Sequence, residues 1–288
     1  MGILKMDMMA DARPIAEIPA VAFKNVTCRF ASTARKAGQG GQIYTAVENV
    51  SLNVMDGEFV SIVGPTGCGK STLLNVAAGL MCPTEGEIEI LGAPLRGVNN
   101  SAGYMFQAES LMAWRSALRN VTVGLEYRGV DASLAHERAM EWLKKVGLAG
   151  FEDRYPHQLS GGMRKRASLA QMLVLDPQIV LLDEPFSALD AQTRVLMENE
   201  LLALWAANKK SVLFITHDLE EAISMSDRVI VLSAGPGTHP IAEFKIDLPR
   251  PRDVSEIKHT RKFMELHREI WDVMKEEVLK GYAQSKRG

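Results

Sequence analysis

The sequence predicts an α/β fold with a parallel β-sheet at its centre, and two stretches carry this prediction. The first is the mostly apolar run at residues 59–63, which precedes a glycine-rich loop and a segment of helical character at residues 71–78. The second is the apolar run at residues 179–182, which ends in Asp183 and Glu184. Such runs are typical of strands that a parallel sheet buries on both faces, and ligands bind at the carboxyl ends of these strands.

Composition excludes several classes of protein. At 288 residues, with 47% hydrophobic and 24% charged residues, the chain can bury a sizeable core. Its net charge of −2 provides no basic field for a nucleic-acid backbone, so no nucleic-acid partner is expected. No apolar run approaches the roughly twenty residues of a membrane helix, and the N-terminus lacks the apolar region of a cleavable signal. We expect a soluble, cytosolic protein with a flexible tail at residues 1–18.

The N-terminal part predicts an antiparallel sheet. Apolar and polar residues alternate over residues 21–26 and 46–54, as they do in half-exposed strands. Residues 31–42 are rich in Gly, Ala and Lys and are expected to form a flexible loop. Asp56 and Gly57 predict the turn into the strand at residues 59–63.

The glycine-rich loop after that strand has the residue types that bind a phosphate chain. Glycines let backbone N–H groups approach the phosphates, a lysine reaches the β- and γ-phosphates, and a hydroxyl ligates Mg²⁺. The helix that follows directs the positive end of its dipole at the same place. The loop predicts a site for ATP or GTP, formed by Gly64, Pro65, Thr66, Gly67, Cys68, Gly69, Lys70, Ser71 and Thr72.

Cys68 lies inside this loop and has two interpretations. The neighbouring lysine and the helix dipole would lower its pKa and raise its reactivity, or it is a small residue that fits the loop. Cys28 and Cys82 lack the spacing of a zinc site, and a count of three does not suit a disulfide framework. All three are expected to be reduced thiols.

Helical and strand patterns continue beyond the loop. Apolar residues at helical spacing predict helices over residues 131–146 and around residues 197–205, and strands are expected at residues 211–215 and 229–232. Residues 241–288 are expected to form a C-terminal extension with a last helix. One face of that helix carries Phe263, Leu266, Ile270, Val273 and Met274. This face either packs on its own domain or serves dimer contact or regulation.

Asp183 and Glu184 add chemistry to the nucleotide site. Asp183 ends a buried strand and is placed to hold Mg²⁺ through water, opposite Ser71. Glu184 is left without a metal role, and a carboxylate beside a γ-phosphate orients the attacking water or accepts its proton.

A second anion-binding helix terminus is predicted at residues 159–163. Ser160 is a good N-cap, and the glycines after it expose backbone N–H groups. Here the sequence resembles the ATP-binding cassette (ABC) family, whose signature motif is LSGGQ. Leu159, Ser160, Gly161 and Gly162 match its first four positions, whereas Met163 stands where glutamine is most frequent.

The other motifs of the family occur in the same order. Gln107 matches the glutamine that contacts Mg²⁺ and the attacking water, and His217 matches the histidine that contacts the γ-phosphate. Phe30 matches the aromatic residue that stacks on adenine, with Tyr44 as the competing candidate. The D-loop motif is matched by Ser187, Ala188, Leu189 and Asp190.

The resemblance covers about residues 20–235 and implies a fold, an activity and a dimer. The implied fold is a P-loop NTPase with a RecA-like core sheet, an N-terminal antiparallel β-subdomain, a helical signature subdomain at about 108–165 and a short C-terminal helical extension. The ATPase domain would span residues 19–240. The implied activity is ATP hydrolysis with Mg²⁺ in a homodimer, in which the signature of one subunit covers the ATP of the other.

The LSGGM signature, residues 111–115 and residues 248–253 resemble importer ATPases for nitrate, taurine and alkanesulfonates. This resemblance implies a membrane permease partner, a periplasmic solute-binding protein as an indirect partner, and a place at the cytoplasmic face of the bacterial inner membrane. Residues 108–115 are expected either to form a groove for the permease or to pack in the core. The alternatives are an ABC exporter and an ABC protein of DNA repair or ribosomes, and the chain does not identify the solute.

Overall fold

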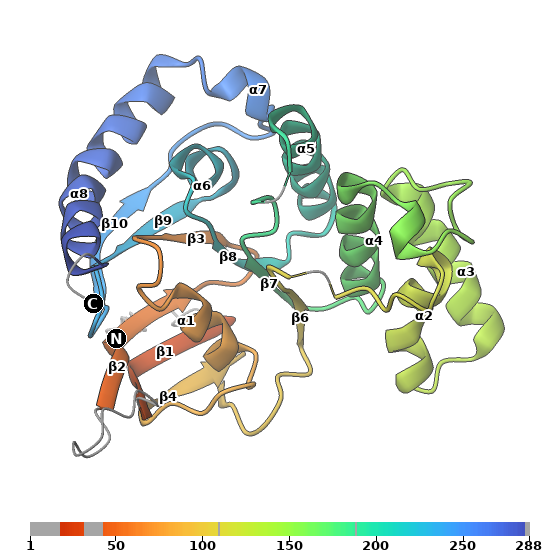
Figure 1. The fold of residues 1–288 in the computed structure, drawn as a ribbon, viewed down its shortest axis with the longest axis horizontal. Helices are drawn as coiled ribbons and strands as arrows, with labels where there is room; N and C mark the ends of the chain where they lie inside the picture. Colours follow the sequence, from red (N-terminus) through yellow and green to blue (C-terminus); the bar gives the residue numbers. More distant parts are fainter. Residues whose placement is uncertain (1–17, 32–42, 109, 188, 286–288) are drawn as a thin grey trace, which may run out of the picture.

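Two β-sheets and a set of helices make up the structure, a computed structural model that describes residues 18–31, 43–108, 110–187 and 189–285. Figure 1 shows the smaller sheet below the larger one, three helices projecting to one side, and a long helix along the opposite side. Residues 1–17 of the tail expected at 1–18, residues 32–42 of the loop expected at 31–42, and Ala188 lie outside the described residues. Ala31, expected in that loop, is the last residue of a β-strand.

The larger sheet has six strands in the order β10-β9-β3-β8-β7-β6. All neighbours in it run parallel except β10, which pairs antiparallel with β9. In each of β3, β7 and β8 all five residues are buried, which explains their nearly continuous apolar sequences. The strands of this core sheet are β3 (Phe59–Val63), β6 (Ala102–Met105), β7 (Ile179–Asp183), β8 (Ser211–Ile215), β9 (Arg228–Leu232) and β10 (Pro240–Lys245).

The smaller sheet is antiparallel and has the strand order β2-β1-β4-β5. Its strands are β1 (Val21–Ala31), β2 (Ile43–Val54), β4 (Glu85–Ile90) and β5 (Ala93–Pro94). The alternation in the sequence reflects one buried face, which packs with helix α1 (Lys70–Ala77) against the core sheet. The predicted α/β fold, with an antiparallel β-subdomain beside a parallel core, is thus confirmed.

Three helices form an arm beside the core sheet (Figure 1). They are α2 (Ala117–Tyr127), α3 (Ala132–Lys145) and α4 (Gly161–Leu173), with a short 3₁₀ helix, η1 (Pro156–Gln158), before α4. Apolar side chains of the three helices share one buried cluster. The Asp131 carboxylate caps α3 by accepting from the amides of Ser133 and Leu134. The boundary expected at residue 165 falls inside α4, so this helix joins the arm to the core.

The remaining helices cover the face of the core sheet opposite α1 and the smaller sheet. They are α5 (Ala191–Asn208), α6 (Leu219–Met225), α7 (Val254–Ile257) and α8 (Arg261–Ser285). The predicted stripe on α5 is buried against β7 and β8, and Phe263, Ile270 and Met274 of α8 pack on α6 and β9. The expected boundary after residue 240 falls in β10, so residues up to Lys245 continue the core sheet. Among the described residues, no helix is long and apolar enough to span a membrane.

Glu198 of α5 is a buried carboxylate in an unusual environment. Its side chain is fully enclosed, and neither carboxylate oxygen has a hydrogen-bond partner. Burial raises the pKa of Glu198 to about 7, and the charges of Glu221 and Asp218 act in the same direction while Lys258 and Arg194 oppose it. The folded protein therefore binds this proton more tightly than the unfolded chain does.

We predict that Glu198 makes the folded protein less stable as the pH rises. Because the folded pKa of about 7 lies above the ordinary value of 4.5, the free energy of unfolding should fall between these two pH values. The loss should approach roughly 3 kcal/mol above pH 7. Urea unfolding of Glu198→Gln at pH 5 and pH 8 should show a smaller fall than the unmodified chain. The exposed Glu269→Gln serves as control, and an unchanged fall in Glu198→Gln would contradict the prediction.

Candidate functional site

The residues predicted for nucleotide binding and hydrolysis meet in one cavity at the carboxyl edge of the core sheet. The glycine-rich loop follows β3, Gln107 follows β6, Glu184 follows β7 and His217 follows β8. Because these strands are parallel, the loops after them emerge at the same edge. The cavity has a volume of about 440 Å³, and its lining residues are Thr66, Gly67, Gly69, Lys70, Ser71, Thr72, Gln107, Glu184 and His217.

Close packing dictates the shape of the phosphate loop. Gly69 has φ = 107°, and a Cβ atom there would lie 2.9 Å from Cγ1 of Val47, so the position requires glycine. The buried Lys70 ammonium donates to the carbonyl oxygens of Gly64 and Pro65, at 2.9 Å each. These bonds hold the cation inside the curve of the loop, beside the first turn of α1.

Cys68 is only 2% exposed. Burial raises the pKa of its thiol, although the charge of Lys70 opposes this shift. A buried thiol with a raised pKa is a poor nucleophile. The environment therefore favours the interpretation of Cys68 as a small residue that fits the loop.

Two oxygen ligands suited to a divalent cation lie side by side. The Ser71 hydroxyl donates to Oδ1 of Asp183 at 3.1 Å. Burial raises the pKa of Asp183, with the Glu184 charge acting in the same direction, whereas the Ser71 hydrogen bond and the Lys70 charge lower it. The hydroxyl and carboxylate are the hard donors that Mg²⁺ prefers, so this pair fits the cation. A bound cation would also relieve the cost of the buried Asp183 charge.

Glu184 is held between two side chains from neighbouring loops. Its Oε2 accepts from Nε2 of Gln107 at 3.1 Å and lies 3.1 Å from Nδ1 of His217. Its backbone has φ = 43°, in the left-handed region, and its N–H donates to the carbonyl of Ile215 at 2.9 Å. A left-handed glutamate costs of order 1 kcal/mol or more, and such strain concentrates at functional sites.

The signature residues lie at the start of α4, away from this cavity. The Ser160 hydroxyl caps the helix by accepting from the Met163 amide at 3.3 Å. A Cβ atom at Gly162 would lie 2.8 Å from Thr193, so the helix start packs closely on α5. None of the residues 159–163 lines the 440 Å³ cavity of its own chain.

The described D-loop residues connect Glu184 to α5. The Ser187 hydroxyl donates to the Glu184 carbonyl at 3.0 Å, and Leu189 is buried. Asp190 caps α5 by accepting from the Thr193 amide at 3.0 Å, and this hydrogen bond lowers the pKa of Asp190.

Phe30 and Tyr44 are partners across the β1–β2 pair, so their side chains share one face of the sheet. They are 37% and 42% exposed, and neither lines the 440 Å³ cavity. The Tyr44 hydroxyl lies near Gly235, in the loop beside Cys68. Both rings are exposed on the same face of the sheet, so the choice between them stays open.

Two cations hold the site loops in place, and sequence analysis did not single them out. Lys165 of α4 is buried, and its Nζ donates to the Gln107 carbonyl at 3.0 Å. Arg194 of α5 donates to the Leu189 carbonyl at 3.3 Å and to Asp218 at 3.2 Å, beside His217. Arg194 thus connects the D-loop to the histidine loop. The position of Arg194 one turn after Asp190 was a sequence signal for the contact with Leu189, whereas Asp218 is distant in the chain.

The comparisons with known proteins agree with this geometry. Residues 47–187 match the ABC transporter family. The chain is 49% identical over 241 residues to an uncharacterized ABC transporter ATP-binding protein of Methanocaldococcus jannaschii, covering 83% of this chain and 88% of that protein. The chain belongs to the ABC transporter family. It is an ATP-binding subunit, and its predicted ATPase activity and fold class are confirmed.

Other relatives of this ABC protein carry more specific names. A taurine import ATP-binding protein, TauB, of Jannaschia sp. is 39% identical over 269 residues, covering 90% of this chain and 96% of that one. Among solved structures, the dimeric post-hydrolysis state of an ATP-binding cassette bound to ADP and Pi is similar with a TM-score of 0.69. That cassette is 34% identical, and the match covers 80% of this chain and 100% of the cassette.

We predict that Arg194→Gln lowers kcat for ATP hydrolysis about tenfold, which corresponds to about 1.4 kcal/mol, and leaves ATP binding nearly unchanged. The substitution removes the cation that joins Leu189 to Asp218. It also removes the Arg194 Nε that lies 3.6 Å from Oε1 of the buried Glu221. Arg194→Lys should recover only part of kcat, because an ammonium lacks the planar fork of donors. Steady-state kinetics with Arg261→Gln, a side chain 90% exposed, provide the control. An unaltered kcat would show that Arg194 does not position these loops.

Proposed function

We propose that this ABC protein hydrolyses ATP as one of two copies that together energise solute import through a separate membrane permease. The observation that carries the proposal is the contact of Glu184 with both Gln107 and His217, at 3.1 Å each, in the cavity of the phosphate loop. A carboxylate so placed is suited to orient water against a γ-phosphate.

Each group in the cavity has a proposed part in hydrolysis. The N–H groups at the start of α1 and the Lys70 ammonium bind the β- and γ-phosphates. Ser71 and Asp183 would hold Mg²⁺, which would neutralise charge on these phosphates. Glu184 orients the attacking water and accepts its proton, while His217 contacts the γ-phosphate. Gln107 holds the Glu184 carboxylate in place before the reaction.

A second copy would complete the site. Residues 159–163 do not reach the nucleotide cavity of their own chain, although the helix start exposes the N–H groups of Gly161 and Gly162. In the proposed dimer these groups bind the γ-phosphate held by the other copy. Such a dimer is two-fold symmetric, and the loss of the γ-phosphate removes the bridge between its halves. The dimeric cassette structures support this arrangement.

We predict that Glu184→Gln binds ATP, hydrolyses it at least about a hundredfold more slowly and accumulates as a dimer with ATP. The amide keeps the size of the side chain but cannot accept the proton from water. Phosphate release measures turnover, and analytical ultracentrifugation with and without ATP measures assembly. Glu220→Gln, which changes an exposed carboxylate in the first turn of α6, is the control. A normal turnover rate in Glu184→Gln would contradict the assignment.

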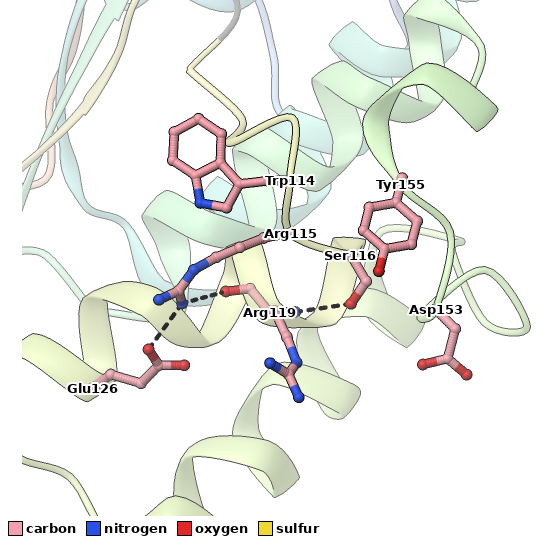
Figure 2. Close-up of a pocket in the computed structure, with 7 residues that line it drawn as sticks. All are labelled: Trp114, Arg115, Ser116, Arg119, Glu126, Asp153 and Tyr155. Atoms are coloured by element: carbon pink, nitrogen blue, oxygen red, sulfur yellow. Dashed lines mark hydrogen bonds and ion pairs between the residues drawn. The ribbon is translucent and has the colours of Figure 1, made fainter.

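The proposed permease site is a cavity of about 660 Å³ on the helical arm. Figure 2 shows Trp114 and Arg115 on one side of it and Tyr155 with Asp153 on the other. Trp114 is 76% exposed, whereas Arg115 is held by an ion pair with Glu126 at 2.8 Å. An exposed indole above a charged cavity suits a short amphipathic helix of another protein.

The chain segment that leads from Gln107 to Trp114 connects the nucleotide site to the arm cavity. This segment follows Gln107, whose carbonyl accepts from Lys165 and whose side chain contacts Glu184. A permease helix seated beside Trp114 would therefore act on the same loop that holds Glu184. This connection supports coupling between the permease and hydrolysis.

We predict that the tagged chain retains a multi-span permease from mildly solubilised membranes of its host, and that Trp114→Ala reduces this retention several-fold. The lost indole removes apolar contact area at the centre of the proposed site. Mass spectrometry identifies the retained proteins, and Tyr127→Ala, an exposed ring of the same arm outside the cavity, is the control. Recovery of ribosomal or DNA-bound proteins would overturn the transport proposal.

The solute class and the location are proposed on relatives alone. Similarity to taurine import ATP-binding proteins supports a sulfonate or a related small anion, import from a periplasmic solute-binding protein and a place at the cytoplasmic face of the inner membrane. A permease recovered together with such a binding protein would support import. A permease without one would favour an exporter.

A further inference from the structure

A second cavity adjoins the nucleotide site and lies between the phosphate loop and α8. Its volume is about 530 Å³. One wall is formed by Pro65 and His217, and the other by α8 through Trp271, Val278 and Tyr282. We call this cavity the α8 groove.

One apolar face of the helix α8 packs on α6 and β9, and a second row of apolar side chains lines the groove. Phe263 and Ile270 are buried against α6 and β9, so the face predicted from the sequence packs on its own domain. On the groove side, Trp271, Val278 and Tyr282 are 43%, 37% and 60% exposed. Their spacing of seven and four residues places them in one row along the helix. Exposed aromatic rows of this kind mark interaction surfaces.

The position of the groove wall is fixed, because the end of α8 is attached to the loops around the nucleotide site. The buried Glu277 carboxylate accepts from the Ala234 amide at 2.7 Å and pairs with Lys280 at 2.5 Å. Gly281 lets the helix approach the phosphate loop, since a Cβ atom there would lie 3.3 Å from Cβ of Pro65. The row of apolar side chains is therefore held at a constant position beside Pro65.

The groove is continuous with the surface that the proposed dimer covers. Thr66 and His217 line both the nucleotide cavity and the groove. In the proposed dimer, the partner that covers the nucleotide cavity lies over these two residues. It then reaches the row of Trp271, Val278 and Tyr282 next to them.

We propose that the α8 groove is a contact surface for a second copy of this chain, so that α8 takes part in the ATP-dependent dimer. The inference rests on the proposed function, in which two copies enclose ATP. It assigns the dimer a contact outside the nucleotide motifs. Apolar area buried there stabilises the closed dimer, and ATP is needed to bring the two copies over the groove.

Adjacent residues of α8 provide a matched test in the Glu184→Gln background. Val278 lines the groove, whereas Leu279, 67% exposed, does not. Val278→Glu should raise the protein concentration for half-dimerisation with ATP at least about tenfold, because a buried charge is costly at a contact. Leu279→Glu should change it less than about threefold. Analytical ultracentrifugation measures the dimer, and binding of a fluorescent ATP analogue shows that both variants retain a folded nucleotide site.

A second measurement introduces no charge into the groove. In a Glu184→Gln chain with the exposed Cys82 changed to serine, position 278 or 279 is changed to cysteine and reacted with a maleimide. The remaining native thiols, Cys28 and Cys68, are buried. ATP should slow the labelling of Val278→Cys several-fold and leave that of Leu279→Cys unchanged.

The outcomes separate the inference from the proposed function. Normal ATP-dependent dimerisation of Val278→Glu, with no protection of Val278→Cys, would overturn the inference and leave the nucleotide dimer standing. The groove would then be covered by the permease or by another segment of the same chain. Failure of Glu184→Gln itself to dimerise with ATP would overturn the proposed dimer and this inference together. Impaired Val278→Glu with protected Val278→Cys supports both.

Discussion

The parallel alignment of β6, β7, β8 and β3 is the constraint on which the nucleotide site depends. Each of these strands contributes one loop, and the register pairs Leu182 with Phe214 and Asp183 with Ile215 at the carboxyl edge. Side chains alternate between the two faces of a strand, so a slip of one residue would turn Asp183 away from Ser71. The sheet is buried between helices on one side and α1 with the β-subdomain on the other, and this burial maintains the register.

Long cationic side chains connect the loops at that edge to the helices around them. Lys165 fixes the Gln107 carbonyl from the helix that begins with the signature, and Arg194 joins Leu189 to Asp218 from α5. In the proposed function, movement of the arm or of α5 would reach the groups that contact Glu184 through these hydrogen bonds. We therefore propose them as the route by which a permease on the arm and a nucleotide in the cavity affect each other.

In the C-terminal extension, apolar residues lie on two faces of α8, and the two faces have different neighbours. Apolar residues on one face of α8 cover α6 and β9, which is the first of the two alternatives that the periodicity left open. A further row lies beside the phosphate loop, and Gly281 allows the close approach to Pro65. Periodicity indicates that an apolar face is buried or bound, but the identity of its neighbour depends on where the helix lies in the fold.

The sequence by itself determined the local features: the buried strands, the phosphate loop and the N-cap at Ser160. Each of these depends on residues a few positions apart, so composition and spacing are sufficient to predict it. Only the tertiary structure decided that β10 joins the core sheet, that Arg194 bridges two loops, and that α8 forms a groove with Pro65. It also left Phe30 and Tyr44 as equivalent candidates, because they are paired across two strands. These contacts join residues far apart in the chain, and their geometry is set by packing of the whole domain.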